Sequence, residues 1–550
     1  MIGFVRPILL AAAWALALPR PSFALAAPPT SEASPPDGSD LVETIDATAK
    51  SAPGASEAEL TAPVPSAPVP GPSVAPWTAP VTASPEQSSE RFELHGWARQ
   101  SLELGLSKPP VPSADDRTIL PYDQLAAKSQ LFIRARYSRA RWFEANVSGA
   151  ISYSLFETAP AHADTTFDGF NGQSVRGVVE PQLYEAFIGL FTQDLDVRIG
   201  QQRLAWGNAE FLSPNDVMNA RDLRDPLLSE AELRRIPSLM LRADLDLGFA
   251  TLQGVVEPAF TPDRYDVYGS NWAAVQPDAP IWARGLANLA ARSLDPTLQE
   301  PAQRLLAATQ YPKSNFTAPV LGARLSWSAA GLDVNYYYQY GFDGPLLEVE
   351  PAFAQNLASL DYNTIGLANL QPWLSAIDAG APPLAVRFVR RHHVGLDLAT
   401  TAGPVALRLD AAYESKRVFA RRDLIGVVSP SLEGVLSAEY QTGDQHKLAL
   451  LEVEYTRIVD APNAPLLIYS RDTAALAGDV RWPIWRAFGF ELRGLLGLTS
   501  RTVIAQPELN LQSEHWVLSL GSVLLDGEAY SLGGHFRRNL DAYSKVKLLF

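Results

Sequence analysis

Charged residues that are separated by one intervening position are the residues of this chain best placed to act together. The spacing recurs at Arg134 and Arg136, Arg408 and Asp410, Glu452 and Glu454, and Glu491 and Arg493. On a β-strand, positions two apart point to the same face, so each pair would project from one side of a sheet. Such side chains must be solvated or paired, because burying a bare ion costs several kcal/mol. The spacing therefore predicts a polar, charged surface.

Catalytic and metal-binding signatures are missing from the sequence. It contains no G-x-S-x-G, H-E-x-x-H, phosphate-binding loop or G-x-G-x-x-G motif, and it has no cysteine. Only His392 and His393 are adjacent histidines, and neighbours on a strand point to opposite faces, so they could not easily share one metal. We therefore expect no enzymatic activity, no metal and no cofactor.

Composition excludes some partners. The 550 residues carry a formal net charge of -15, which argues against nucleic acid, since phosphate binding needs basic faces. Without cysteine, a secreted form would have no disulfides and no thiolate site.

The N-terminal region predicts export. Arg6 precedes an apolar core at residues 8–18, and Ala24-Leu25-Ala26 fits the small-x-small cleavage rule, so residues 1–26 are interpreted as a signal peptide. Residues 27–90 are rich in Pro, Ala and Ser and could not bury enough apolar surface to order, which predicts a disordered periplasmic linker. This linker is most simply a solvated spacer, but it could also dock a periplasmic partner.

From residue 91 onward the hydrophobic period becomes two. Val405, Leu407 and Leu409, for example, alternate with Arg408 and Asp410. Alternation persists over about ten residues, which is the length of a tilted strand that crosses a bilayer. No uninterrupted apolar stretch after the N-terminal core is long enough for a spanning helix.

The links between the predicted strands alternate between short turns and long loops. Strands are expected at 92–106, 128–139, 141–156, 181–191, 194–205, 236–246, 248–258, 318–328, 331–342, 389–400, 404–416, 433–443, 446–458, 474–482, 485–500, 512–524, 527–537 and 541–550. Short turns on one side and long loops on the other are typical of bacterial outer-membrane barrels. Residues 91–550 are therefore predicted to form an all-β, transmembrane antiparallel β-barrel of about 18 strands (16 to 18), with long extracellular loops that carry short helices. An even strand count would place both termini in the periplasm of a Gram-negative bacterium.

The end of the chain and the aromatic residues agree with this placement. Phe550 follows Leu548 and Val546 on one face, an ending that resembles the signal read by the barrel-assembly machinery. Aromatic residues such as Trp142, Phe249 and Trp482 crowd the predicted short turns, where the headgroups of the outer-membrane lipid would lie.

If the apolar face contacts lipid, the charged face lines the lumen. The predicted pore-lining residues are Arg134, Arg136, Arg198, Arg242, Arg324, Arg408, Asp410, Glu452, Glu454, Glu491 and Arg493. Arginines without an acidic partner would favour anionic solutes, whereas arginines that are each neutralised by a cross-strand acid would leave the pore unselective. Both alternatives stay open at the level of sequence.

Two loops carry helical patterns. Residues 281–310 place Trp282, Leu286 and Leu289 at helical spacing, and residues 351–378 carry a weaker pattern. An apolar helix stripe must be buried, either by folding inward against the lumen or by forming a surface cap.

The stretch RIGQQRLAWG at residues 198–207, followed by SPNDVMN at residues 213–219, resembles a signature of uncharacterised porin-like outer-membrane families. Their pattern is a G-x-Q-x-x-x-W-G strand end and a P-x-D-V-x-N loop. The layout over residues 92–550 is similar to that of alginate-export and substrate-specific porins. The resemblance implies that residues 206–226 lie near a constriction, including Trp206, Asp216, Arg221, Asp222, Arg224 and Asp225.

The sequence thus predicts an outer-membrane channel for a polar solute or polymer, anionic if unpaired arginines line it. One alternative is a structural or assembly component with a plugged lumen and a periplasmic partner docked by the linker. A second alternative, an outer-membrane hydrolase, has less support because no Ser/His/Asp set stands out.

Overall fold

A computed structural model describes most of the chain from Glu90 onward. The described residues are 90–106, 125–155, 179–229, 231–263, 272, 279–292, 297–307, 318–360, 364–442, 447–485 and 487–550. The predicted signal peptide and all but the last residue of the predicted linker lie outside them.

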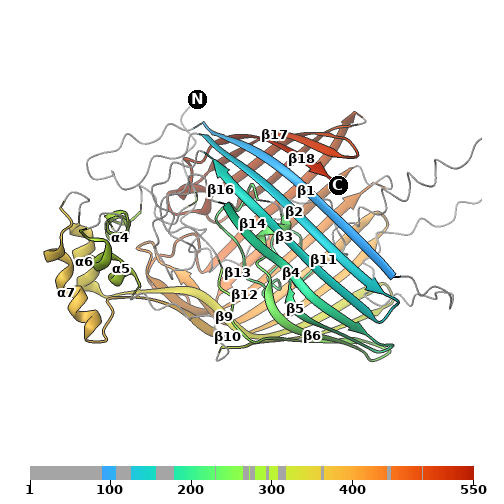
Figure 1. The fold of residues 1–550 in the computed structure, drawn as a ribbon, viewed down its shortest axis with the longest axis horizontal. Coiled ribbons are helices and arrows are strands. Elements are labelled where there is room, and N and C mark those ends of the chain that lie inside the picture. The colour runs from blue at the N-terminus through green and yellow to red at the C-terminus, as the bar shows by residue number, and fades with distance from the viewer. Residues whose placement is uncertain are drawn as a thin grey trace, which may run out of the picture.

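Eighteen antiparallel strands form one closed sheet (Figure 1). Each strand pairs with its neighbours in the chain, and β1 also pairs with β18, which closes the barrel and leaves no free edge. The strands are β1 Glu90–Gly105, β2 Leu125–Arg139, β3 Phe143–Leu155, β4 Val179–Phe191, β5 Leu195–Gln202, β6 Ser238–Asp246, β7 Thr251–Glu257, β8 Val320–Ala329, β9 Leu332–Val349, β10 Leu384–Ala402, β11 Val405–Ala420, β12 Gly426–Gln441, β13 Leu448–Ile458, β14 Asp472–Trp485, β15 Phe488–Gly497, β16 Thr502–Gln512, β17 Trp516–Asp526 and β18 Asp541–Leu549. The predicted fold class and strand number are confirmed.

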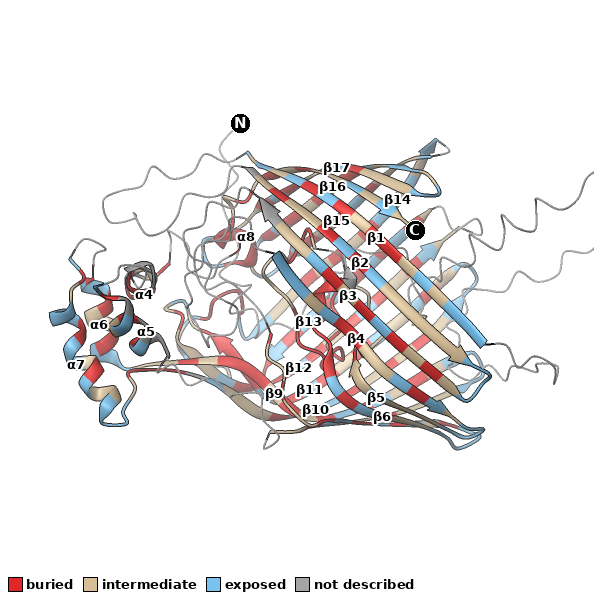
Figure 2. Ribbon diagram, viewed as in Figure 1, coloured by how far each residue is buried: buried red, intermediate tan, exposed pale blue. Residues whose placement is uncertain are grey.

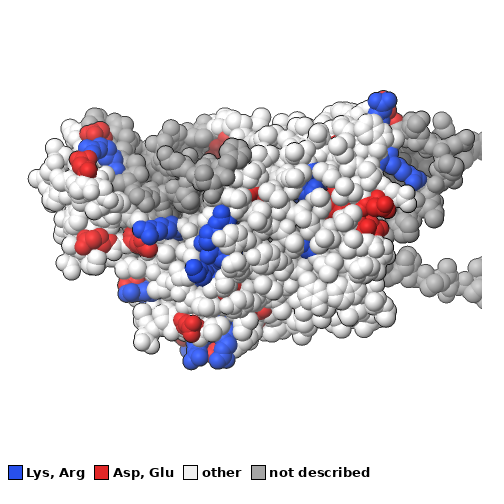
Figure 3. Space-filling view, turned by 90° about the horizontal axis from the view of Figure 1, so that it is seen from below, with Lys and Arg blue, Asp and Glu red and all other residues white. Residues whose placement is uncertain are grey.

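The two faces of the wall differ as the period of two predicts. Along β13, Glu452 and Glu454 are buried on the inner face, whereas Leu451 and Val453 are 53% and 41% exposed on the outer face. The same alternation gives the strands of Figure 2 their bands of buried and exposed residues. Figure 3 shows that the middle of the wall is largely uncharged on the side it displays. An apolar outer band on a closed barrel is a surface for lipid, so the strands span a membrane.

A reciprocal pair of backbone hydrogen bonds completes the closure. The Gly96 amide donates to the Phe550 carbonyl at 2.8 Å, and the Phe550 amide donates to the Gly96 carbonyl at 3.0 Å. A Cβ atom at Gly96 would lie 2.6 Å from both the Phe550 ring and the Phe132 carbonyl oxygen. Gly96 therefore makes room for the last aromatic ring of the chain at the seam.

Two strand predictions near the C-terminus are wrong. The predicted strand at 527–537 is a loop that contains the short helix α8 (Leu532–His535), and the predicted loop at 501–511 is β16. Pro507 is an unusual residue for a strand, because proline cannot donate to a strand ladder. In the fold, Pro507 lies where the pairing of β16 with β17 is interrupted, between Ala505 and Glu508.

The prediction of a long loop at 417–432 is also wrong. Strands β11 and β12 extend through most of it, and only residues 421–425 connect them. Their extensions, together with those of β9 and β10, rise above the rest of the rim at the loop end of the barrel (Figure 1).

The predicted helical loops form a cap outside the barrel rather than folding into the lumen (Figure 1). The cap consists of α4 (Ile281–Arg292), α5 (Gln299–Ala307), α6 (Pro351–Ser359) and α7 (Leu367–Asp378), with α4 packed on α6 and α5 on α7. At Gly285 of α4 a Cβ atom would lie 1.8 Å from the Leu357 carbonyl oxygen of α6, so this close contact requires glycine. None of the helices in the described ranges is long and apolar enough to cross a membrane.

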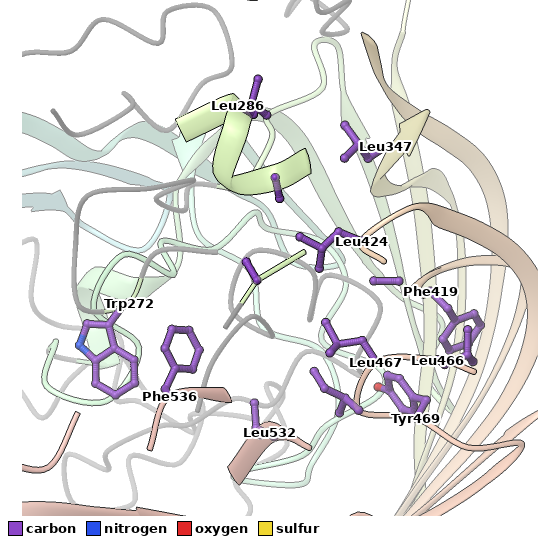
Figure 4. Packing of buried hydrophobic residues seen from close by; sticks show 14 of the residues in the cluster. Trp272, Leu286, Leu347, Phe419, Leu424, Leu466, Leu467, Tyr469, Leu532 and Phe536 are labelled. Atoms are coloured by element: carbon purple, nitrogen blue, oxygen red, sulfur yellow. The ribbon is translucent and has the colours of Figure 1, made fainter. Parts of the chain in front are cut away.

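Apolar residues join the cap to the neighbouring loops. The Trp282 indole donates to the Asp423 carbonyl at 2.9 Å, which ties α4 to the link between β11 and β12. Figure 4 shows side chains from several loops meeting in one cluster, in which Trp272 faces Phe536 with ring centroids 5.3 Å apart. The loop end therefore packs as one body.

We predict that Gly96→Ala weakens barrel closure, because its Cβ atom must displace Phe550 or the β2 backbone. The free energy of unfolding should fall by about 1–3 kcal/mol, measured by urea unfolding of the detergent-solubilised barrel. Gly254→Ala on β7 is the matched control, since its Cβ atom would meet nothing within 4 Å. Equal stabilities of the two variants would contradict this role of Gly96.

Candidate functional site

The segment that joins β5 to β6, residues 203–237, lies inside the barrel and is called here the lumen segment. Its described residues are mostly buried. Its side chains or backbone bond to inner-face residues of β4, β7, β9, β10, β11 and β13, which lie around much of the circumference. A segment that reaches strands so widely spaced around the wall must cross the lumen.

Two wall carboxylates hold the first turns of this segment by its backbone amides. Glu452 of β13 accepts hydrogen bonds from the amides of Glu210, Phe211 and Leu212 at 2.6 to 3.0 Å. Asp410 of β11 accepts from the amides of Asn208 and Ala209 at 3.1 to 3.3 Å. Buried amides outside a sheet or helix need such partners, and a carboxylate is a strong acceptor. These acids therefore dock the segment onto the wall.

A third carboxylate, Asp397 of β10, extends this network. It accepts from the Asn208 side-chain amide at 2.7 Å, from Asn335 at 2.7 Å and from the Tyr337 hydroxyl. Asp410 also accepts from the Ser213 hydroxyl at 2.7 Å. Three adjacent strands thus present their inner polar side chains to residues 207–213.

The wall is recessed where side chains of the lumen segment meet it. Trp206, which is 1% exposed, donates from its indole nitrogen to Gln253 at 2.8 Å and packs on Tyr337. A Cβ atom at Gly322 of β8 would lie 2.7 Å from the Trp206 ring. On β10, a Cβ atom at Gly395 would lie 2.0 Å from Asn215 Oδ1. Both glycines let the segment lie directly against strand backbone.

Asn219 fastens the two ends of the segment together. Its carbonyl oxygen accepts from the Leu204 amide at 2.5 Å, and its amide nitrogen donates to the Gln202 and Ile236 carbonyls at 3.2 and 3.1 Å. Asn219, the last residue of the SPNDVMN stretch, therefore connects the end of β5 with the chain that enters β6. Gly207, with φ of +85°, provides the turn that follows Trp206.

Ion pairs organise the second half of the segment. Asp216 pairs with Arg221 and, at 3.0 Å, with Arg235. Arg224 pairs with Asp222 at 2.7 Å and with Glu180 of β4 at 2.8 Å. In a separate contact, Asp225 accepts from the Leu228 amide and the Ser229 hydroxyl, both at 3.1 Å. All six residues predicted for a constriction thus lie within the lumen segment, and five of them also pair or bond locally in this way.

Burial shifts two pKa values in the segment. Burial raises the pKa of Glu210, and the neighbouring Glu439 adds to this shift while Arg408 opposes it. Burial, together with the nearby Arg221, Arg493 and Arg235, lowers the pKa of Arg234 to about 9. Arg234 still carries its charge at neutral pH and donates to the Pro226 carbonyl at 3.1 Å.

The eleven residues predicted to line the pore all lie on strands at positions of the inner face. Their arginines form ion pairs with neighbouring acids: Arg134 with Glu185, Arg136 and Arg198 with Glu144, Arg242 with Asp244, Arg408 with Glu439, and Arg493 with Glu491. Arg324 lies within electrostatic reach of Asp397. Among the acids, Asp410 and Glu452 are engaged with the lumen segment, whereas Glu454 accepts from the Thr456 hydroxyl.

The sequence did not single out the part of the wall that contacts the lumen segment. This part includes Gly322, Gly395, Tyr337 and Gln253. A signal was present, because a glycine at an inward position of a strand often marks a close approach of another backbone. Nothing in the sequence, however, specified which segment would approach. Within the described ranges, no three acidic or histidine side chains converge as a metal site would require.

We predict that Asn219→Ala loosens the lumen segment, since the buried Leu204 amide and two carbonyls lose their partner. The local cost should be about 1–3 kcal/mol, seen as faster amide hydrogen exchange within residues 203–237 while the wall strands stay protected. Asn510→Ala is the control, because Asn510 bonds to Glu491 and Ser519 within the wall. Unchanged exchange in the Asn219 variant would contradict this fastening role.

Comparison with known proteins shows a family to which the chain belongs. The family model described as "Protein of unknown function (DUF1302)" matches residues 146–484, a range that contains the lumen segment and most of the wall that receives it. No curated protein sequence matches the chain.

Solved structures to which the chain is similar include OccAB1 of Acinetobacter baumannii (TM-score 0.43, 8% identity, covering 84% of this chain and 96% of that one). OmpF of Salmonella typhi in complex with daunomycin has a TM-score of 0.38 at 8% identity, covering 84% of this chain and 97% of that one. A mutant of the Rhodopseudomonas blastica porin has a TM-score of 0.33 at 11% identity, covering 84% and 100%. The resemblance to an uncharacterised porin-like family is confirmed at the level of the family model: the chain belongs to the DUF1302 family.

Proposed function

We propose that this protein is an outer-membrane channel that lets a polar solute pass between the lumen segment and the barrel wall. The observation that carries the proposal is the inner face of the barrel, where ion-paired and hydrogen-bonded side chains occupy positions that a packed interior would fill with apolar ones. Charged groups at a wet wall replace part of the hydration of a passing solute, which an apolar wall could not do.

The location follows from the same wall. A closed barrel with an apolar outer band suits the outer membrane of a Gram-negative bacterium. The start of β1 and the end of β18 lie at the end with the short turns, since Glu90 pairs with Arg139 beside the β2–β3 turn and Phe550 bonds to Gly96. On the usual orientation of such barrels, this end faces the periplasm.

The solute path is assigned to the sector of β14 to β18. Hydrogen bonds from the lumen segment to β7, β9, β10, β11 and β13 fix most of it against the opposite part of the wall, and Arg99 of β1 donates to its Leu228 carbonyl at 3.1 Å. The β14–β18 sector carries charges that pair with one another: Arg481 and Arg493 share Glu491, and Lys545 lies 3.7 Å from Glu508. Of these, Arg481 and Lys545 are partly exposed. These groups can solvate a polar solute as it passes.

The pairing of the arginines favours the weakly selective alternative. An arginine that shares its charge with a carboxylate at 2.5 to 3.0 Å attracts an anion less than a lone one does. We therefore propose a general polar permeant rather than a strict preference for anions.

A structural component with a closed lumen is the second candidate. The observation that favours it is the apolar cluster at the loop end, which includes Phe211, Leu212, Leu227 and Leu228 of the lumen segment. Under this alternative, the segment and loops seal the mouth and the N-terminal region docks a periplasmic partner. Conductance distinguishes the two candidates.

We predict that Glu452→Ala raises single-channel conductance in planar lipid bilayers. Without this carboxylate, three buried amides of the lumen segment lose their acceptor, so the segment should leave its docked position more often. The expected increase is about twofold or more, with larger current fluctuations. The prediction requires first that the wild-type protein conducts.

The matched control is Glu454→Ala, two positions along the same face of β13. Glu454 accepts from Thr456 of its own strand, so its loss removes an inward carboxylate without freeing an amide of the lumen segment. A wild-type barrel that folds but never conducts would sink the channel proposal, and equal currents from both variants would refute the docking role of Glu452.

We also predict that Glu491→Gln shifts selectivity toward anions. The substitution removes the carboxylate that Arg481 and Arg493 share at 2.8 and 2.5 Å, so that Asp479, at 2.7 and 3.9 Å, has to balance two arginines on the proposed solute path. Reversal potentials in a salt gradient measure the shift. Glu144→Gln makes the same charge change opposite Arg136 and Arg198, away from that path. A larger shift from Glu144→Gln would contradict this assignment and indicate a solute path along β2 to β5 instead.

A further inference from the structure

The outer face of β9 and β10 carries a cluster of cations and aromatic rings near the loop end. The guanidinium of Arg390 lies 3.9 Å from the centroid of the Phe342 ring and 4.8 Å from that of Tyr340. One of its nitrogens donates to the Pro319 carbonyl at 2.5 Å. Packing on two rings fixes the plane of the guanidinium and leaves its other edge directed away from them.

His392 and Lys416 extend this cluster along and across the strands. His392 is exposed on the same outer face as Arg390, and its Nδ1 lies 2.9 Å from the Tyr338 hydroxyl. The His392 amide donates to the Ser415 hydroxyl at 2.8 Å, which places the neighbouring Lys416 of β11 beside it. Lys416 is exposed. Arg390, His392 and Lys416, with the rings of Tyr338, Tyr340 and Phe342, are called here the rim cluster.

The rim cluster stands at the height of a headgroup layer. Arg390 lies twelve positions before Ala402, the last residue of β10 at the turn end. With a rise of about 3.3 Å per residue and a tilt of about 40°, Arg390 is about 30 Å from that end, just beyond an apolar band of about 25 Å. Figure 3 shows lysine and arginine side chains gathered between the helical cap and the uncharged wall on this side.

Three other cations of this rim are neutralised within the protein. Arg387 pairs with Glu348 at 3.1 Å, Arg421 with Asp423, and Arg457 with Asp472 at 3.6 Å. Within the described part of the chain, neither Arg390 nor Lys416 forms an ion pair with an acidic side chain. Acids close by in sequence, such as Asp343 and Glu414, face the lumen and pair with Arg391. Among the described residues, no acidic side chain therefore neutralises the outward charge of Arg390 and Lys416, which is available to an external anion.

We propose that the rim cluster binds the phosphate of a membrane lipid headgroup in the leaflet at the loop end. The guanidinium edge of Arg390 and the ammonium of Lys416 contact the phosphate oxygens. The rings of Tyr338 and Tyr340 lie against the upper part of the acyl chains and the sugar or glycerol of the headgroup, while Phe342, packed on Phe260, supports Arg390 from below. This site is on the lipid side of the wall and is independent of conduction through the lumen.

The test uses the full-length folded barrel in detergent micelles and native mass spectrometry. Bisphosphorylated lipid A and its dephosphorylated form are the paired probes, since they differ only in the phosphates. The wild-type protein should bind the phosphorylated form about tenfold more tightly. The double variant Arg390→Gln/Lys416→Gln should lose this preference, whereas Arg457→Gln should keep it because Asp472 already neutralises Arg457.

Heat-dependent gel mobility checks that each variant is folded, so loss of binding cannot be confused with loss of the barrel. Equal binding of the two lipids by the wild-type protein, or an unchanged preference in the double variant, would overturn the proposal. Displacement of the lipid by inorganic phosphate alone at the same concentration would also overturn it in favour of a site for free phosphate. Unaltered conductance in the double variant is expected, since both residues face outward.

Discussion

Backbone hydrogen bonding in a medium without water is the constraint from which the rest of this structure follows. Amides and carbonyls in the membrane must find partners within the sheet, so eighteen strands pair in chain order and β1 meets β18. The reciprocal bonds between Gly96 and Phe550 complete this pairing at the last residue of the chain. Closure then forces one face outward to lipid and the other inward, and each strand alternates accordingly.

The same constraint acts a second time inside the barrel. The lumen segment has little regular structure, so its buried amides cannot bond to one another as they would in a helix or sheet. Asp410 and Glu452 provide the missing acceptors, and Asn219 satisfies the amide and carbonyls where the segment leaves and rejoins the wall. Inner-face acids therefore have two uses in this protein. Some neutralise arginines, and others hold the segment that narrows the lumen.

Adjacent residues of β10 illustrate how alternation separates two chemistries within one strand. Arg391 points inward and pairs with Asp343 and Glu414, whereas Arg390 points outward over Tyr340 and Phe342. A single step along the backbone thus changes the surroundings of an arginine from a polar lumen to the lipid boundary. Residues that face the lumen and residues that face lipid can consequently vary independently.

The sequence by itself determined the barrel, its strand number, the face on which each charge lies and the positions of the loop helices. The strands follow from a period of two, the helices from helical spacing and the turns from their residue types. All of these signals are local in sequence. The sequence prediction was wrong at β16, where Pro507 lies at a gap in the ladder, and at residues 527–537, where the loop that contains α8 replaces the expected strand.

Only the tertiary structure decided which residues meet across the lumen. Glu452 and Phe211 are 241 positions apart, and nothing between them in sequence encodes their contact. The motif at residues 198–219 indicated a special segment, but its docking depends on the shape of the wall at Gly322 and Gly395, which exists only after closure. Likewise, the pairing of each arginine with an acid depends on strand register, which the alternation of residue types does not fix.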